Sequence, residues 1–227
     1  GVIADYEITE KFLEYIIRKV SGSNRFFRPK VMITVPYGVT SVESRAVHEA
    51  ILQAGTRDAY LIQQPLAAAL GMDLPIGTPS GNMVLSLGAG TVQAAVLAMY
   101  GIVAADSQRA GGMQLDEAIV SYVRKKFGLI IGTATAEKVK LELGTAVRQE
   151  EERSIEIQAQ DQVSGLPRSL NLTNDDVMEA LTDTLKSFVE TARKVLEKTP
   201  PELVSDIIDR GVAICGGGAY LPGIDRL

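Results

Sequence analysis

Two glycine-rich turns are the segments of this sequence best suited to holding a phosphate group. Residues 88–91 (GAGT) lie between two short apolar runs, and residues 216–218 (GGG) follow a third. Small residues let backbone N–H groups approach an anion closely, and Thr91 would add a hydroxyl. A loop between a strand and a helix, as expected at 216–218, is a natural place for a phosphate or ribose. Glycine is also frequent at hairpin tips, so ordinary turn chemistry stays an open alternative.

Three further polar side chains could act on a bound ligand. Glu137 and Lys140 stand three residues apart on a predicted helix and could grip a base or a ribose. An isolated pair at this spacing is also typical of a solvated ion pair, so that alternative stays open. Gln64 precedes Pro65 at the end of a predicted strand, where its amide could orient a water molecule or bond within the loop.

Phe26 and Phe27 stand between Arg25 and Arg28 in a polar loop. Adjacent residues cannot easily both face one core, so at least one of these rings is expected to be exposed. Two aromatic rings among cations suit insertion at an anionic lipid interface. The alternative is that both rings fold back onto the domain.

The first 80 residues alternate helical and strand patterns. Residues 8–20 repeat apolar side chains four apart and predict an amphipathic helix. Residues 31–35 are an apolar run ended by Pro36, which predicts a strand buried on both faces. A capping box at residues 40–43 opens a helix that ends at Gly55, and a second strand follows at 60–62 before an alanine-rich helix. This alternation favours parallel strands covered by helices.

Residues 75–81 (PIGTPSG) form the clearest linker, and a different pattern follows it. Strands at 83–87 and 92–99 enclose the turn at 88–91, which is a hairpin and not the helix-opening dinucleotide fingerprint. Asp116 and Glu117 are expected to open a helix, where the helix dipole favours acids. The other expected elements are a strand at 102–105, a helix at 115–127, a helix capped by Thr135, strands at 153–160 and 166–172, a long helix capped by residues 173–176 and ended by Pro200-Pro201, a strand at 212–214, and a helix starting near Pro222-Gly223.

Composition narrows the class of protein. The net charge of -5 argues against a nucleic acid partner. A single cysteine excludes an internal disulfide framework and suits a reducing cytosol, and with a single histidine it makes a structural zinc site implausible. No run reaches the ~18 apolar residues of a membrane span. The start at Gly1, without methionine, predicts a piece of a longer chain.

Taken in order, these segments resemble the MreB family of bacterial actins over essentially the whole chain. The matching stretches are GVIADYEIT, RPKVMITVP, RAVHEAILQAGTRDAYLI, PLAAALG, SGNMV, LDEAI, AEKVKLELG, SGLPR, LEKTPPELVSDIIDRG and GGGA. The resemblance implies an α/β, actin-like (ribonuclease-H-like) fold whose two lobes clasp ATP or ADP with Mg²⁺. It also implies self-association into filaments on the inner face of the bacterial cell membrane, in the cytoplasm, with cell-shape and wall-synthesis proteins as partners.

The resemblance assigns parts of the chain to parts of that fold. Residues 1–80 would be the C-terminal part of the first lobe, and residues 81–227 the second lobe with a small α+β insertion at about 129–175, while the family's first phosphate loop is missing. Gln64 would orient the attacking water, and Phe26 and Phe27 would contact membrane. The nucleotide-binding positions would be Gly88, Ala89, Gly90, Thr91, Glu137, Lys140, Gly216, Gly217 and Gly218.

Departures from the family pattern fall on the nucleotide site. Ser86 stands where the family has Asp, Ala89 where it has Gly, and Met113 where an acid follows Gly112. A hydroxyl is a poor ligand for a hard dication, so no metal ligand is assigned. Gln64 replaces the second Glu of a Glu-Glu-Pro motif and has no titratable group. We therefore expect a degraded nucleotide site.

Several functions remain as hypotheses. The main alternative to a weakly catalytic, filament-forming scaffold is an active ATP-hydrolysing member of the same family. A sugar kinase or chaperone-type ATPase is disfavoured, because no sugar-binding acid stands at a strand end. A small-molecule enzyme would need a nucleophile and a base, and the one histidine, His48, lies in a predicted helix without an evident partner.

Overall fold

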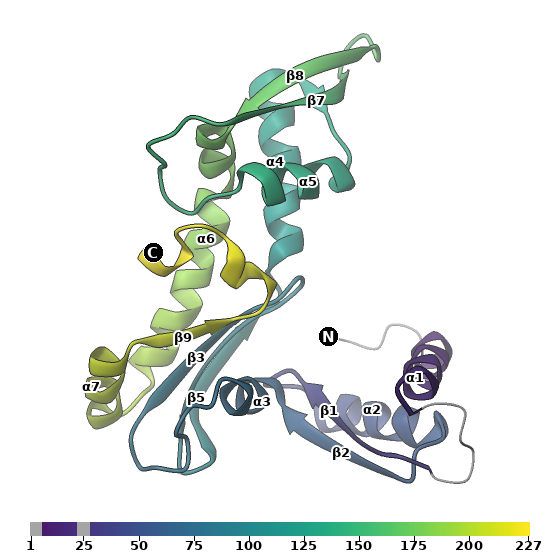
Figure 1. Ribbon diagram of the computed structural model, residues 1–227, viewed down its shortest axis with the longest axis vertical. Coiled ribbons are helices and arrows are strands. Elements are labelled where there is room, and N and C mark those ends of the chain that lie inside the picture. The colour runs from purple at the N-terminus through teal and green to yellow at the C-terminus, as the bar shows by residue number, and fades with distance from the viewer. Residues whose placement is uncertain (1–5, 22–27) are drawn as a thin grey trace.

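The computed structural model describes residues 6–21 and 28–227. Figure 1 shows two lobes, an elongated one and a smaller one that extends sideways from its lower end. The smaller lobe contains three helices and two strands: α1 (Tyr6–Ser21), β1 (Lys30–Val35), α2 (Ser41–Gln53), β2 (Asp58–Gln63) and α3 (Gln64–Gly71).

The elongated lobe begins with a β-meander and continues with helices that run along it (Figure 1). Its strands are β3 (Asn82–Leu87), β4 (Val92–Ala98), β5 (Gly101–Gln108), β6 (Leu129–Ile130), β7 (Ser154–Asp161), β8 (Pro167–Thr173) and β9 (Val212–Cys215). Its helices are α4 (Gly112–Phe127), α5 (Thr133–Leu143), α6 (Asn174–Glu197) and α7 (Pro201–Arg210), followed by 3-10 turns at Gly217–Tyr220 and Ile224–Arg226.

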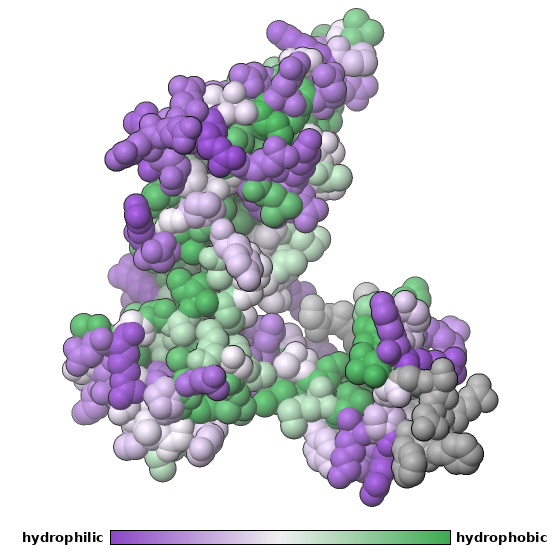
Figure 2. Space-filling model, in the orientation of Figure 1, coloured by the Kyte–Doolittle hydropathy of each residue, from purple (hydrophilic) through white to green (hydrophobic). Residues whose placement is uncertain are grey.

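The strands of the described residues form three sheets. β1 and β2 pair in parallel, which confirms the arrangement expected from their alternation with helices. The order of the second sheet is β5-β4-β3-β9, with antiparallel hairpins and a parallel β3–β9 pair. β6, β7 and β8 form a third sheet at the far end of the elongated lobe, where Figure 2 shows mainly hydrophilic side chains. The division of the chain at residue 80 stays a prediction.

The expectation that β1 is buried on both faces is wrong. Its residues alternate in exposure, and Met32 is 65% exposed. Val35 is buried and Ile33 half-buried on the opposite face. The described elements leave the Met32 side of this two-stranded sheet uncovered. The apolar run at residues 31–35 therefore forms a strand with only one covered face.

Four element boundaries also differ from expectation. α4 begins at Gly112, so Asp116 lies in its second turn. Its carboxylate therefore does not interact with the helix dipole at the first turn, as had been expected. α5 starts at Thr133 after an N-cap at Gly132, so Thr135 is not its cap. α7 was missed because its two prolines were taken only as a stop, although proline also opens helices. Near Pro222-Gly223 the chain forms only a short 3-10 turn.

The main core runs from the β3–β4 face, which α6 covers, into the space between α4, α5 and α6. Strand alternation sends Met83, Leu85 and Leu87 to the face that α6 covers. The buried helical residues are Leu115, Ile119 and Val123 from α4 and Val177, Leu181, Leu185, Phe188 and Val195 from α6. This packing fixes the start of α4 beside the β3–β4 turn.

The opposite face of the same sheet carries a second, smaller core. Val84, Ala95 and Leu97 point to this side and pack with Ala69 of α3 and with Ile76. Ile76 and Thr78 also accept backbone hydrogen bonds from the β4–β5 turn, at 2.8 and 3.0 Å. The two lobes therefore share buried apolar surface.

The N-terminus of α6 is held by a capping box and by a charged network. Thr173 and Asp176 exchange the reciprocal cap bonds, and Lys126 Nζ of α4 lies 2.9 Å from Asp176 Oδ1. The Tyr122 hydroxyl joins them by donating to Glu179, and burial followed by this bond raises the pKa of Tyr122 to about 12. The network ties α4 to α6 at the end of the lobe that carries the third sheet.

Asp176→Asn should reduce stability at neutral pH more than at acidic pH. Burial alone would raise the pKa of Asp176, but hydrogen bonds from Lys126 and Thr173 outweigh it and lower the pKa. A depressed folded-state pKa stabilises above the unfolded value of about 3.9, and this stability is lost as the pH falls through the folded-state pKa. We expect a loss of about 1 kcal/mol at pH 7 and a smaller loss at pH 3, measured by urea unfolding.

The matched control for this prediction is Asp183→Asn on the same helix. Asp183 is exposed and pairs only with Lys186, three residues on. Its substitution should change the free energy of unfolding by less than about 0.5 kcal/mol at either pH. An equal loss at pH 7 and pH 3 in Asp176→Asn would contradict a contribution from its ionisation.

Candidate nucleotide site

The β3–β4 turn is built into the start of α4 by backbone hydrogen bonds. Within the turn, Gly88 N donates to Thr91 O at 2.9 Å. The first amides of α4 then reach across to the turn: Gly112 N donates to Gly88 O at 3.0 Å and Met113 N to Ala89 O at 2.8 Å. The carbonyls of the turn therefore satisfy orphan donors at the helix N-terminus. The turn is held in place before any ligand binds.

The glycine loop at residues 216–218 packs directly on the end of β3. Gly216 has φ +90°, and a Cβ there would lie 2.5 Å from Leu87 O. A Cβ on Gly218 would lie 2.7 Å from Leu87 Cβ, whereas one on Gly217 would meet nothing within 4 Å. The loop at 216–218 and the turn at 88–91 are thus neighbours, joined through Leu87.

Lys140 is buried between α4 and α5. Its Nζ lies 2.7 Å from Asp116 Oδ1 and donates to Gly112 O at 3.0 Å. The two side chains are only 14% and 12% exposed. The ammonium thus neutralises a buried carboxylate and fixes the peptide that bonds to the β3–β4 turn. The sequence explained Asp116 only by the preference of acidic residues for the start of a helix. Its ion pair with Lys140 corrects that interpretation.

Glu137 does not form the ion pair considered as an alternative for this helix. Among the described residues its carboxylate has no salt bridge, and it is exposed, one turn before Lys140. Glu137 is therefore available to a ligand. Lys140 instead stabilises the β3–β4 turn indirectly, through its hydrogen bond to Gly112 O. The nucleotide-binding role of both residues stays a prediction.

A cavity of about 500 Å³ opens between the two lobes. One wall is the β1–α2 loop of the first lobe, and the other is the β3–β4 turn with the end of β5 and the start of α4. Its lining residues include Tyr37, Gly38, Gly90, Thr91, Arg109, Met113 and Gln114. Gln114 Oε1 is buried and has no hydrogen-bond partner among the described residues. A polar ligand could supply that partner.

Gln64 does not line this cavity but connects to it through Gln93. Gln93 Nε2 donates to Gln64 Oε1 at 2.5 Å, and Gln93 Oε1 accepts from Tyr37 N at 2.9 Å. Ser107, opposite Gln93 on β5, donates to Tyr37 O at 3.3 Å. Gln93 and Ser107 of the second lobe therefore bond to the N–H and the carbonyl of Tyr37, a residue of the first lobe that lines the cavity.

The residues present suit a nucleotide better than they suit its cation. The glycines at 111, 216 and 218 leave no room for a Cβ because they pack directly on the β3–β4 turn and on Leu87, and this packing keeps the backbone of these segments close together. Ser86, in contrast, is buried on β3 and carries only a hydroxyl, and Met113 is 57% exposed at the cavity. Among residues 6–21 and 28–227, no group of three or more His, Cys, Asp or Glu side chains could hold a metal ion.

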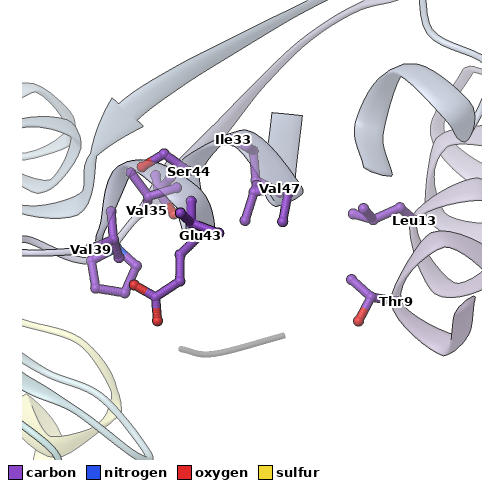
Figure 3. A pocket seen from close by; sticks show the side chains of 12 residues that line it. Thr9, Leu13, Ile33, Val35, Val39, Glu43, Ser44 and Val47 are labelled. Carbon is purple, nitrogen blue, oxygen red and sulfur yellow. The ribbon is translucent and has the colours of Figure 1, made fainter. Parts of the chain in front are cut away.

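A second cavity, of about 400 Å³, lies within the first lobe. Figure 3 shows Thr9 and Leu13 of α1 facing Ile33 and Val47 across it. Its lining is mainly apolar and separate from the glycine turns. Glu43 borders both cavities, but its carboxylate accepts bonds from Thr40 N and Oγ1 at 2.8 Å, so it acts as a helix cap.

Other residues singled out in the sequence have different outcomes. Phe26 and Phe27 lie outside the described residues. No helix in the described ranges is long and apolar enough to cross a membrane. His48 does have a partner, since its Nε2 lies 3.2 Å from Ala59 O on β2. That contact ties α2 to the neighbouring strand.

The sequence reasoning missed Gln93, Tyr37 and Ser107. The available signal was Gln93, a lone polar residue in an otherwise apolar strand, since a buried amide needs partners. Tyr37 acts through its backbone and Ser107 through a contact 70 residues away in the chain. Neither contact produces a pattern that can be recognised in the neighbouring sequence.

Comparisons with known proteins show the family to which the chain belongs. The family described as "MreB/Mbl protein" matches residues 1–227. The cell shape-determining protein MreB of Pasteurella multocida (strain Pm70) is 48% identical over 231 residues, which cover 100% of this chain and 66% of that protein. The cell shape-determining protein Mbl of Bacillus subtilis (strain 168) is 42% identical, with 100% and 68% covered.

Solved structures show the same fold. The crystal structure of MreB5 of Spiroplasma citri bound to AMPPNP superposes with a TM-score of 0.94 at 32% identity, covering 100% of this chain and 68% of that one. A MamK double helical filament superposes at 0.78 and 17% identity, over 99% of this chain and 67% of that one, which shows the fold alone. The chain thus spans about two thirds of the length of these relatives. It has the actin-like α/β fold and belongs to the MreB/Mbl family.

Proposed function

We propose that this chain is part of a nucleotide-binding, filament-forming actin-like protein that acts in bacterial cell shape. The observation that carries the proposal is the family match over residues 1–227. Relatives at 42–48% identity are named cell shape-determining proteins. Self-association into filaments, and cell-shape and wall-synthesis proteins as partners, follow from the same resemblance.

ATP or ADP is the proposed ligand. The Spiroplasma citri MreB5 structures contain AMPPNP and ADP. In this chain the backbone at residues 88–91 and 216–218 would hold the phosphates, with Thr91 adding a hydroxyl, and Glu137 would bind on the adenosine side. Lys140 would support that site through its bonds to Asp116 and Gly112 O.

Hydrolysis is proposed to be weak or absent. Mg²⁺ would supply charge neutralisation at the phosphates, but Ser86 and Met113 offer no carboxylate to hold its waters. Gln64 cannot take up a proton, so no general base is provided at its position. The chain would then keep the fold and the subunit contacts while turning over nucleotide slowly.

Calorimetry on the full-length protein tests both statements. ATP and ADP should bind, with affinities that change by less than about threefold when Mg²⁺ is removed, and Mg²⁺-dependent phosphate release should not exceed background. Absence of binding would contradict the nucleotide proposal. Clear turnover that disappears in Gln64→Ala would instead favour the alternative, an active ATP-hydrolysing protein.

The loop with Phe26 and Phe27 is proposed to contact the inner face of the cell membrane. The proposal rests on two aromatic residues between Arg25 and Arg28, a composition suited to an anionic lipid interface. The full-length protein should co-sediment with liposomes that contain anionic lipid. Replacing both phenylalanines by serine should reduce the bound fraction several-fold, and unchanged sedimentation would refute the assignment.

A further inference from the structure

The amide of Gln93 connects the ends of both parallel strands of the first lobe. Tyr37 follows β1 and Gln64 follows β2, and Gln93 reaches them from β4 of the second lobe. Gln93 is only 1% exposed. A buried amide in this position must satisfy both its oxygen and its nitrogen within the protein.

The chemistry of the partners determines the orientation of both amides. A backbone N–H can only donate, so the Gln93 atom 2.9 Å from Tyr37 N must be the oxygen. The nitrogen of Gln93 therefore faces Gln64, and because that nitrogen only donates, the facing atom of Gln64 must be its oxygen. This assignment does not depend on distinguishing oxygen from nitrogen by position.

In the series of hydrogen bonds that links Tyr37, Gln93 and Gln64, one polar group remains without a partner among the described residues, the NH₂ of Gln64. Gln64 is half-buried, and its Nε2 has no hydrogen-bond partner in the part of the chain that the structure describes. Its oxygen is already used by Gln93. The side chain thus keeps two N–H donors that no described residue uses, while its oxygen faces Gln93.

We infer that Gln93 is a positioning residue that makes Gln64 a hydrogen-bond donor and not an acceptor toward whatever binds between the lobes. This rests on the proposed nucleotide function only for the identity of the ligand. A donor suits a phosphate oxygen or the oxygen of a water molecule, whereas drawing a proton from that water requires an acceptor. The hydrogen bonds of Gln93 thus leave the NH₂ of Gln64, and not the oxygen that faces Gln93, to meet such a group.

Side-chain amide exchange measured by NMR tests the orientation without nucleotide. In the full-length protein labelled with ¹⁵N at glutamine side chains, the Gln93 NH₂ should exchange slowly and the Gln64 NH₂ at least tenfold faster. In Gln93→Glu, one carboxylate oxygen still accepts from Tyr37 N, and the other repels the Gln64 oxygen. The Gln64 amide should then turn over, and its NH₂ should become at least tenfold slower.

Two controls separate orientation from general destabilisation. Gln93→Met removes both bonds at similar volume and should leave the Gln64 NH₂ exchanging fast. Gln158, which bonds to Ser169 on the remote third sheet, should be unaffected in every variant. A Gln64 NH₂ that already exchanges slowly in the unmodified protein would overturn the inference.

A second pair of variants covers the case in which Gln93→Glu does not fold. Gln64→Glu keeps an acceptor for Gln93 and should leave the Gln93 NH₂ slow, whereas Gln64→Met should accelerate its exchange about tenfold. Equal exchange in the two would overturn the inference. If the unmodified protein binds neither ATP nor ADP, the proposed function fails, while these exchange rates still decide the orientation.

Discussion

Replacing Lys140 with methionine should lower the free energy of unfolding by about 3 kcal/mol or more. The substitution leaves Asp116 buried, 12% exposed, without its cation, and an uncompensated buried charge costs about 3–5 kcal/mol. It also removes the donor to Gly112 O, which holds the peptide bonded to the β3–β4 turn. Urea unfolding would show the loss of stability, and calorimetry should show weaker binding of ATP.

The same helix provides the matched control. Lys138 pairs with Glu142 at 3.8 Å, but its side chain is 64% exposed. Lys138→Met should therefore cost less than about 0.5 kcal/mol. Adding Asp116→Leu to Lys140→Met should recover most of the lost stability, since an apolar pair can replace a buried ion pair. If the double variant is no more stable than Lys140→Met, the loss does not come from the unpaired carboxylate.

Gly216→Ala should displace the glycine loop at residues 216–218 from the end of β3. The new Cβ would lie 2.5 Å from Leu87 O, at a φ of +90° that L-residues rarely adopt. We expect a loss of about 2 kcal/mol or more in the free energy of unfolding. The dissociation constant for ATP should rise about tenfold, the equivalent of one lost hydrogen bond.

Gly217→Ala is the neighbouring control. A Cβ at this position meets nothing within 4 Å, so unfolding should change by less than about 0.5 kcal/mol. If both alanine variants lose the same stability, the close approach of Gly216 to Leu87 is not what holds the loop. Measuring stability without nucleotide keeps this comparison independent of ligand contacts at Gly217.

The parts of the fold that depend on local chemistry could be predicted from the sequence. The capping boxes at Thr40 and Thr173 are formed as expected, because each relation spans only three residues. The β3–β4 turn was also placed correctly, since two short apolar runs joined directly by a glycine turn define a hairpin locally. The resemblance then gave the overall fold, which local patterns alone could not.

Contacts between distant residues could not be predicted in the same way. The partner of Lys140 is Asp116, 24 positions earlier and on another helix, whereas the sequence suggested only its helical neighbour Glu137. The bond between Gln93 and Gln64 crosses from one lobe to the other. Such pairs depend on how elements pack, and single-sequence periodicity says nothing about that arrangement. The exposure of Met32 was mispredicted for the same reason.

The packing of α3 changes where this chain could bend. By sequence, residues 75–81 look like the natural joint, but Ala69 and Ile76 lie in one core with Val84 and Leu97. Rotation at 75–81 would pull that core apart and expose it to water, at about 25 cal/mol for each Å². Rotation just before Gln64 would keep Ala69 and Ile76 in that core and would instead break the hydrogen bonds that Gln93 and Ser107 make to Tyr37. α3 should therefore move together with the elongated lobe. Separating the chain after residue 80 would divide this shared core.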